Sequence, residues 1–317
     1  MSEDIQISEA PSLKAPSLIA AWPGMGNVAM LTVKYMIRQL NAQPFAEMAP
    51  GDYFAPTGAI VKKQLILPPE KPKNNFYYYQ SVDGKNDILF FVGSSQPISH
   101  REYAFASKIL DFAASFGAKM IYTSAAAPSD MHFQDKPRVF AVPNSEMMLK
   151  KMMEHHVHFM GEGNIAGMNG LIISIATERS MNAMCLLGEI PFFTAQIEFP
   201  HAAVELIRVF SRLLDVKIDL ADLELYASKK EKELKPLSAL LVKEDEPKPP
   251  EEEAPISEPE SEGQISETTR LKVEKLFKQA EFDGTYKSKM RLKETLDEHG
   301  LFDEYLDRFL DLFKKTS

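Results

Sequence analysis

The chain has 317 residues, 44% of them hydrophobic, which is enough for one large domain with an appendage or for two domains. Its 36 basic and 45 acidic residues give a net charge of −9, which argues against electrostatic capture of nucleic acid or anionic lipid. The single cysteine, Cys185, excludes an intrachain disulfide and suits a reducing cytoplasm. The first residues lack the apolar core of a signal peptide, and no apolar run approaches about 18 residues, so we expect a cytoplasmic protein without a membrane span.

Composition divides the chain into four segments. We expect a flexible N-terminus at residues 1–16 and an α/β core domain at residues 17–227. Residues 228–268 are rich in Glu, Lys, Pro and Ser and contain no aromatic residue. Such a segment buries too little apolar surface to offset chain entropy, so we expect a disordered acidic linker. The periodicity of residues 269–317 predicts a helical tail.

Strand and helix signals alternate along the core. Apolar strands are predicted at residues 17–22, 119–125, 157–160 and 183–188, and two strands around an Asp83-Gly84 turn at residues 74–93. Helices are predicted at residues 27–40, 101–116, 164–178 and 202–214, with another that runs from a Ser145 cap to residue 154. This alternation predicts a mixed sheet that helices cover on both faces.

The tail carries three apolar stripes at helical spacing. They comprise Leu271, Val273, Leu276 and Phe277, then Met290, Leu292 and Leu296, then Leu301, Tyr305, Phe309 and Phe313. Gly300 marks the end of the second helix. Three short helices of about 45 residues are small for independent stability, so we expect the tail to dock on the core or on a partner.

The stretch WPGMGNVA joins the first strand to the first helix. Gly24 and Gly26 begin a G-x-G-x-x-A pattern, and Glu47 lies where a dinucleotide fold places its ribose-binding acid. Pro23, however, interrupts the strand just before the first glycine. We therefore favour a tight strand-to-helix turn capped by Asn27, with a dinucleotide site or another small-anion site as alternatives.

A second glycine cluster, GEGNIAGMNG, predicts the start of a helix at Asn164. Gly161 and Gly163 precede this N-cap, and Gly167 and Gly170 fall on the first turns. Glycine in a helix interior costs about 1 kcal/mol, which a sequence tolerates where another backbone must come close. Close packing is thus the favoured interpretation, and an anion held by the backbone N–H groups at the helix start is the alternative.

Polar residues also follow strands at their carboxyl ends, where open α/β sheets bind ligands. His100 and Arg101 precede the second predicted helix, and Glu189 follows a later strand. Ser99 as the cap and Glu102 in a capping box give the favoured structural interpretation of the first group. The alternative is that these residues and the two glycine clusters line one cleft.

The histidines do not predict a metal site. His155 and His158 have i, i+3 spacing, but the apolar residues around His158 indicate a strand, which would separate the two rings. Neither an HExxH pattern nor paired cysteines are present, and Asp130 with His132 form only another strand-exit pair. We expect no metal, no cofactor and no catalytic residues.

Several sequence blocks carry a resemblance to a known family. They include LIAAWPGMGNVA, FFVGSSQPI, PRVFAVPNS and MCLLGEIPFF, and the most specific is the G-x-I-x-G-x-x-G run from Gly163 to Gly170. The region from Ser17 to Tyr226 resembles the proteasome assembly chaperone 2 family in its prokaryotic form. The resemblance implies an α/β three-layer sandwich with a mixed sheet, similar to the purine nucleoside phosphorylase-like fold, assembled as a homo-oligomer. It implies no established reaction.

The end of the chain departs from this resemblance. Archaeal proteasome-binding relatives end in a hydrophobic-Tyr-any residue tail that docks on the proteasome ring, whereas the penultimate residue here is Thr316. The departure argues against that docking mode.

We expect a non-catalytic protein that binds or assembles other proteins as a homo-oligomer, with a trimer preferred and the C-terminal tail available to a partner. The alternative is an enzyme or small-ligand binder for a nucleotide- or phosphate-like ligand. Its cleft would comprise Gly24, Gly26, Asn27, His100, Arg101, Gly161, Gly163, Asn164, Gly167 and Glu189.

Overall fold

The structure is a computed structural model that describes residues 4–55, 58–245, 267–283 and 286–299, and also residues 301, 302, 304, 305, 308, 309 and 312. The chain forms two compact units, Met1–Pro247 and Lys248–Ser317. Within the described ranges, no helix combines the length and the apolarity that a membrane span needs.

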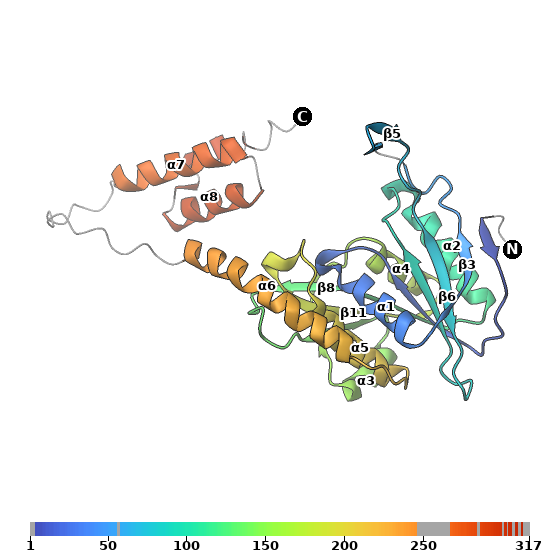
Figure 1. The fold of residues 1–317 in the computed structure, drawn as a ribbon. Coiled ribbons are helices and arrows are strands. Elements are labelled where there is room, and N and C mark those ends of the chain that lie inside the picture. Colours follow the sequence, from blue (N-terminus) through green and yellow to red (C-terminus); the bar gives the residue numbers. More distant parts are fainter. Residues whose placement is uncertain are drawn as a thin grey trace. The chain divides into compact units, whose positions relative to one another are not determined.

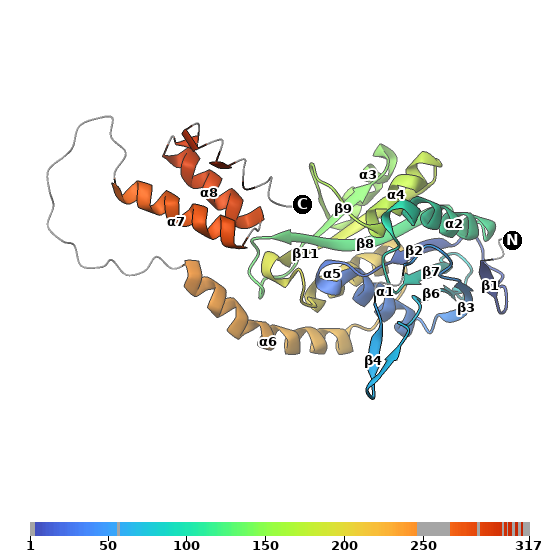
Figure 2. The same cartoon turned by 90° about the horizontal axis from the view of Figure 1, so that it is seen from above.

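A nine-stranded sheet forms the centre of the first unit, in the order β1-β3-β6-β7-β2-β8-β11-β9-β10 (Figures 1 and 2). The central strands β7, β2, β8 and β11 run parallel, whereas β6, β3 and β1 continue the sheet with antiparallel pairings. On the other side β9 pairs antiparallel with β11, and β10 pairs parallel with β9. The predicted mixed sheet is therefore confirmed. The strands are β1 (Ile5–Ile7), β2 (Ser17–Ala21), β3 (Gln43–Met48), β6 (Asn74–Tyr79), β7 (Ile88–Gly93), β8 (Met120–Ser129), β9 (Val139–Pro143), β10 (His158–Phe159) and β11 (Asn182–Pro191).

Helices flank the sheet on both faces and separate two apolar cores. One core joins the sheet to α1, α3, α5 and α6, and the other joins it to α2 and α4. The apolar runs of β2 and β7 are almost completely buried because both of their faces are covered. The helices are α1 (Val28–Gln39), α2 (Glu102–Ser115), α3 (Glu146–Met152), α4 (Met168–Glu178), α5 (Pro200–Leu213) and α6 (Ala221–Asp245), with 3₁₀ turns η1 (Met25–Asn27), η2 (Ser99–Arg101), η3 (Met153–His155) and η4 (Phe192–Thr194).

Two local predictions about this core, the Ser145 cap and the hairpin at Asp83-Gly84, are confirmed. Ser145 caps α3, because its side-chain oxygen accepts a hydrogen bond from the Met148 N–H. Cys185 lies on the central strand β11 and is completely buried. The predicted hairpin is also present, since β6 and β7 pair antiparallel around the Asp83-Gly84 turn.

The boundaries of the core differ from the prediction at both ends. The N-terminal segment expected to be flexible contributes β1, which pairs Ile5 with Met48 of β3. At the other end α6 continues to Asp245, so residues 228–245, which were expected to belong to a disordered linker, are helical. Leu223, Ala227 and Leu234 are buried in the core from this helix, which explains why it continues. The rest of the predicted linker, residues 246–266, lies outside the described residues.

A small hairpin was not predicted. Strands β4 (Ile60–Lys62) and β5 (Leu65–Leu67) pair with each other and form a separate two-stranded sheet. The hairpin projects away from the body of the unit (Figures 1 and 2). All six of its strand residues are exposed although five are apolar.

The second unit contains α7 (Glu267–Asp283) and α8 (Tyr286–Glu298). Its small apolar core contains residues from each of the three predicted apolar stripes. These residues are Val273, Phe277, Leu292, Leu296, Leu301 and Phe309, together with Ala280 and Leu312. Among the other predicted positions, the side chains of Leu271, Met290 and Phe313 and the stop at Gly300 lie outside the described residues.

Candidate functional site

The first glycine turn connects β2 to α1 and is closed by backbone hydrogen bonds. Gly26 and Asn27 both adopt the left-handed conformation, with φ of 60° and 51°. Gly26 donates its N–H to the Ala195 carbonyl at 2.9 Å, and Asn27 donates to the Gly24 carbonyl at 3.0 Å. The amides of Gly26 and Asn27 are thus committed within the chain and are not available to a pyrophosphate. The tight-turn interpretation is confirmed.

Asn27 does not cap α1, so that part of the prediction is wrong. In its left-handed conformation it makes no side-chain cap, and its Nδ2 instead donates to Oε1 of Glu198. The other carboxylate oxygen of Glu198 accepts a 2.6 Å hydrogen bond from the Tyr226 hydroxyl. This hydrogen bond raises the pKa of Tyr226. Glu198 therefore ties the first turn to α6.

The second glycine cluster begins its helix later than predicted. Because α4 starts at Met168, preceded by Gly167 with φ of 73°, Asn164 is not an N-cap. The segment before the helix instead passes close to its first turn. A Cβ atom on Gly170 would lie 1.9 Å from the backbone oxygen of Ile165. The predicted close approach of another backbone at this glycine is confirmed.

The structure brings the two glycine clusters together through two amide side chains. Asn169 accepts the Trp22 N–H at 3.1 Å and donates to the Trp22 carbonyl at 3.3 Å. Gln96 donates to the Pro23 carbonyl at 2.8 Å and accepts the Met168 N–H at 3.1 Å. Gln96 thus occupies an amide of the α4 N-terminus that an anion would otherwise use.

Sequence reasoning missed both of these amides. Asn169 carried a usable signal, because it is a polar residue among the buried apolar positions of α4 and is itself buried. Gln96 lies in the loop after β7 and carried no comparable signal. Its role depends on two backbone groups that are more than seventy residues away along the chain.

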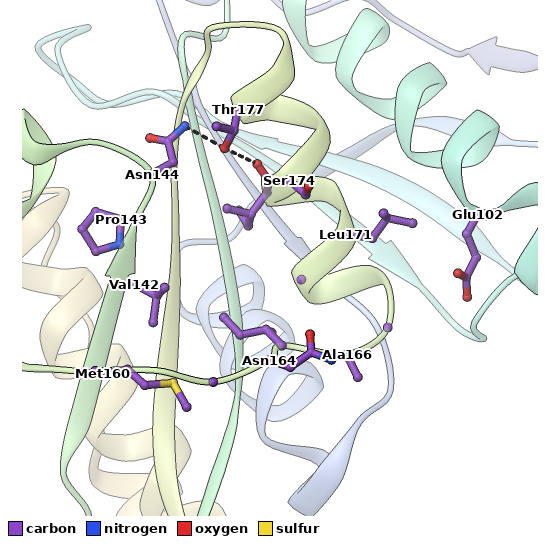
Figure 3. A pocket seen from close by; sticks show the side chains of 16 residues that line it. Glu102, Val142, Pro143, Asn144, Met160, Asn164, Ala166, Leu171, Ser174 and Thr177 are labelled. Atoms are coloured by element: carbon purple, nitrogen blue, oxygen red, sulfur yellow. Dashed lines mark hydrogen bonds between the residues drawn. The ribbon is translucent and has the colours of Figure 1, made fainter.

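A pocket of about 620 Å³ opens beside α4 (Figure 3). Four of the ten predicted cleft residues line it: Gly161, Gly163, Asn164 and Gly167. Apolar surface comes from Val142 and Met160, and from Leu171 on α4. In Figure 3, Val142 and Met160 lie on one side of the pocket, and Glu102 stands across from them beyond Leu171. The volume is within the range of small-ligand sites, about 300–1,000 Å³.

Two polar residues of the pocket, Asn144 and Thr177, lie at its upper end in Figure 3. The Asn144 side chain donates to the Thr177 hydroxyl at 3.1 Å and also to the Met181 carbonyl at 2.8 Å. The Thr177 hydroxyl in turn donates to the Ile173 carbonyl at 2.8 Å. These two side chains therefore already have hydrogen-bond partners within the chain.

Six predicted cleft residues lie outside this pocket, namely Gly24, Gly26, Asn27, His100, Arg101 and Glu189. Arg101 instead binds Asp52, with 2.6 Å between Nη2 and Oδ2, and its guanidinium lies over the Tyr53 ring. The hydrogen bond from Arg101 lowers the pKa of Asp52. His100 is exposed on η2 beside it.

The predicted capping of α2 is wrong. Ser99 lies on η2, and α2 begins at Glu102 without a side-chain cap. Of the group His100, Arg101 and Glu102, which the alternative cleft included, Glu102 lines the pocket beside α4.

Glu189 is buried in an ion pair. Its carboxylate accepts hydrogen bonds from the Arg138 side chain, from the Arg138 N–H at 3.0 Å and from the Ser129 hydroxyl at 2.8 Å. The hydrogen bond from Arg138 is the main reason that the pKa of Glu189 falls from 4.5 to about 2. Through these hydrogen bonds, the carboxylate holds the ends of β8, β9 and β11 together.

The strand predicted around His158 is present as β10. His155 lies on η3 and His158 on β10, so the predicted strand separates them. His132 accepts the Gln134 N–H at 3.3 Å. Among the described residues, no group of three or more His, Cys, Asp or Glu side chains is placed to hold a metal ion.

Comparison with known proteins places this core among relatives of similar length. An uncharacterised protein of Methanocaldococcus jannaschii is 24% identical over 253 residues, covering 78% of this chain and 94% of the relative. The crystal structure of PbaB from Pyrococcus furiosus, an archaeal proteasome activator, is 27% identical, with a TM-score of 0.64 over 74% of this chain and 98% of PbaB.

A second solved structure supports the same fold. PbaA from Pyrococcus furiosus, an archaeal homolog of proteasome-assembly chaperone, is 19% identical, with a TM-score of 0.57 over 76% of this chain and 99% of PbaA. The PAC2 family pattern matches residues 18–238, which include both glycine clusters, most of α6 and the large sheet except for β1 and the first residue of β2. By this match, the chain belongs to the PAC2 family.

Proposed function

We propose that this protein is a non-catalytic, homo-oligomeric binding protein that assists the assembly or activation of a proteasome. The likeness to PbaB carries the proposal, because it extends over 98% of that archaeal proteasome activator at 27% identity. PbaA, described as a homolog of proteasome-assembly chaperone, shares the fold. We retain from the sequence the purine nucleoside phosphorylase-like three-layer class, a trimer and a cytoplasmic location as parts of the same proposal.

The chemistry of the strand exits supports a non-catalytic role. Glu189 is neutralised by Arg138, Arg101 is paired with Asp52, and Asn27 is paired with Glu198. A general acid or base needs a group that is free to reach a substrate. Glu189, the one carboxylate among the predicted cleft residues, is instead held by Arg138, and Arg101 and Asn27 are likewise engaged with neighbouring elements.

Affinity capture tests the proposal. The full-length protein and a version that ends at Pro247, after the first unit, are immobilised and exposed to a lysate of the source cell. We expect full-length protein to enrich proteasome ring subunits, identified by mass spectrometry. Weaker enrichment by the shorter version would assign part of the contact to the C-terminal unit. Recovery of no proteasome subunit by either version would overturn the proposal.

The pocket beside α4 supports a second candidate, a small-ligand binder for a phosphate- or nucleotide-like molecule. Its volume of about 620 Å³ is large enough for such a ligand. A thermal-shift screen with phosphate, nucleotides and amino acids tests it. A ligand at a hundredfold excess over its Kd stabilises the folded state by about 2.7 kcal/mol. A flat screen would remove this candidate and leave the first one unaffected.

A further inference from the structure

The β4–β5 hairpin exposes more apolar surface than a solvated loop of its size requires. We call residues 60–67 the arm. Val61, Leu65 and Ile66 are 71%, 66% and 77% exposed, and Ile60 and Leu67 are each 41% exposed. The arm pairs only with itself and does not join the large sheet. Five exposed aliphatic residues on two short strands indicate a surface that is covered in the working protein.

Both faces of the arm are apolar. Val61 pairs with Ile66, and because side chains alternate along a strand, these two share one face. Ile60 and its partner Leu67 lie on the other face. An isolated two-stranded hairpin is marginally stable in water. A binding site that encloses the arm between two surfaces would bury both apolar faces and so stabilise the hairpin.

The size of the arm fits a protein interface. At their exposed fractions, its five apolar residues present roughly 500 Å² to solvent, against about 800 Å² that each partner buries in a standard interface. The arm alone thus supplies most of one side of such an interface. A few residues at its base would complete the area.

The same chain carries a complementary surface. Met160 and Phe159 are 38% and 37% exposed at β10, the strand that ends the large sheet. Next to them lies the pocket beside α4, which Val142, Met160 and Leu171 line. Gly161 at this pocket leaves open space, because no atom lies within 4 Å of a Cβ added to it. Because β10 is an edge strand, its outer backbone groups are also open to an added strand.

Charge favours this pairing of surfaces. Lys62 and Lys63 are the only charged residues of the arm. Of the residues that line the pocket, one is charged, and it is the carboxylate of Glu102. The cationic tip of the apolar arm thus matches an apolar pocket with one carboxylate at its edge.

The arm and the pocket lie far apart on one copy, so a contact between them must form between different copies. The arm emerges from the chain between β3 and β6, near one edge of the sheet, whereas β10 forms the opposite edge. Figures 1 and 2 both show the arm and α3, which precedes β10, on opposite sides of the unit. An arm and a receptor at opposite ends form a head-to-tail contact, which gives a ring of identical subunits if the rotation between copies closes and an open filament if it does not.

We propose that the arm of one copy occupies the pocket beside α4 and the β10 edge of a neighbouring copy. This inference rests on the homo-oligomeric part of the proposed function and adds the surface that forms the oligomer. The arm inserts its aliphatic side chains against Met160 and Leu171, while its lysines face Glu102.

Cysteine cross-linking of the full-length chain tests the contact directly. One version carries Ile66→Cys, a second carries Met160→Cys, and the two are co-expressed and oxidised. The native Cys185 is completely buried and so does not compete. We expect cross-linked dimers from the mixture and little from either version alone. Val82→Cys, at a fully exposed position in the β6–β7 loop, is the control for Ile66→Cys.

A charge variant gives an independent readout. Val61→Glu combined with Ile66→Glu should shift the mass in light scattering from oligomer to monomer, whereas Val82→Glu should not. Ile66→Cys that cross-links to itself would show that arms pair with each other, and would overturn the assignment of the pocket. An oligomer that survives the double glutamate variant would overturn the inference alone. A monomeric wild type would overturn it together with the homo-oligomeric part of the proposed function.

If the double glutamate variant stays oligomeric but no longer captures proteasome subunits, the arm binds the proteasome and not a second copy. That result would overturn the inference and strengthen the proposed function. The two proposals can therefore fail separately.

Discussion

The two glycine clusters have similar sequences, PGMGN and GEGNIAGMNG, yet they differ in whether their backbone is accessible to a ligand. The first turn is covered, because the Ala195 carbonyl and the Phe199 N–H bond to both sides of Gly26. The second cluster runs outside α4 and lines a pocket of about 620 Å³. The difference arises from elements that are distant in sequence, since η4 and the start of α5 pack on the first turn alone. A glycine-asparagine motif at a helix start therefore does not predict whether its amides are accessible.

The largest expected effect concerns the open cluster. Gly170→Ala places a Cβ at 1.9 Å from the Ile165 backbone oxygen, so the segment that crosses α4 must move. We expect a loss of about 3 kcal/mol in the free energy of unfolding, measured by urea denaturation. Gly161→Ala is the matched control, because no atom lies within 4 Å of its added Cβ. Equal midpoints for the two variants would show that the crossing segment is not held against the helix.

An intermediate effect is expected at the closed strand exit of Glu189. Glu189→Gln replaces a carboxylate that accepts several hydrogen bonds by an amide whose NH₂ faces other donors. We expect a loss of about 2 kcal/mol near neutral pH. Glu205→Gln, which also removes a carboxylate paired with Lys136 and Arg208, is the control for charge loss near the surface.

The same variant makes a pH prediction. Because the pKa of Glu189 is lowered from 4.5 to about 2 in the folded protein, its ionised form stabilises the fold above pH 4.5. This stabilisation is lost as the pH falls from 4.5 towards 2. The difference in melting temperature between wild type and Glu189→Gln should therefore shrink over that window. A constant difference would mean that the ion pair does not set the pKa.

The smallest expected effect tests the link between the two clusters. Gln96→Ala removes hydrogen bonds to Pro23 and Met168 at an exposed position, which should cost about 1 kcal/mol. The freed Met168 amide should also exchange its hydrogen faster, as measured by hydrogen–deuterium exchange. Ser94→Ala, which removes one hydrogen bond in the same loop, is the control. Unchanged exchange at Met168 would show that another group caps α4.

Much of the core could be predicted because its signals are local. The buried run of β2, the turn at Asp83-Gly84 and the Ser145 cap depend on neighbouring residues, and each was found. The mixed sheet followed from the alternation of strands and helices. The need for a close backbone approach at Gly170 followed from the cost of glycine in a helix.

The remaining features depend on contacts between distant segments. Asn27 and Ser99 have the residue types of helix caps, but Asn27 binds Glu198 and Ser99 lies before α2 on η2. The end of the core was placed too early because α6 is polar on average, although Leu234 is buried against α5 and its neighbours. The pocket combines β9, the segment from Met160 and α4, an assembly that no single motif specifies.

The single cysteine, on β11, can report by its chemical reactivity when the large sheet opens. Burial raises the pKa of Cys185 to about 12, so in the folded state the group is neither ionised nor reachable by an aqueous reagent. A maleimide or disulfide reagent can react only when the central strand separates from its neighbours. The rate of that reaction therefore measures how often the central sheet opens. A variant that destabilises only the elements around the sheet should leave this rate unchanged.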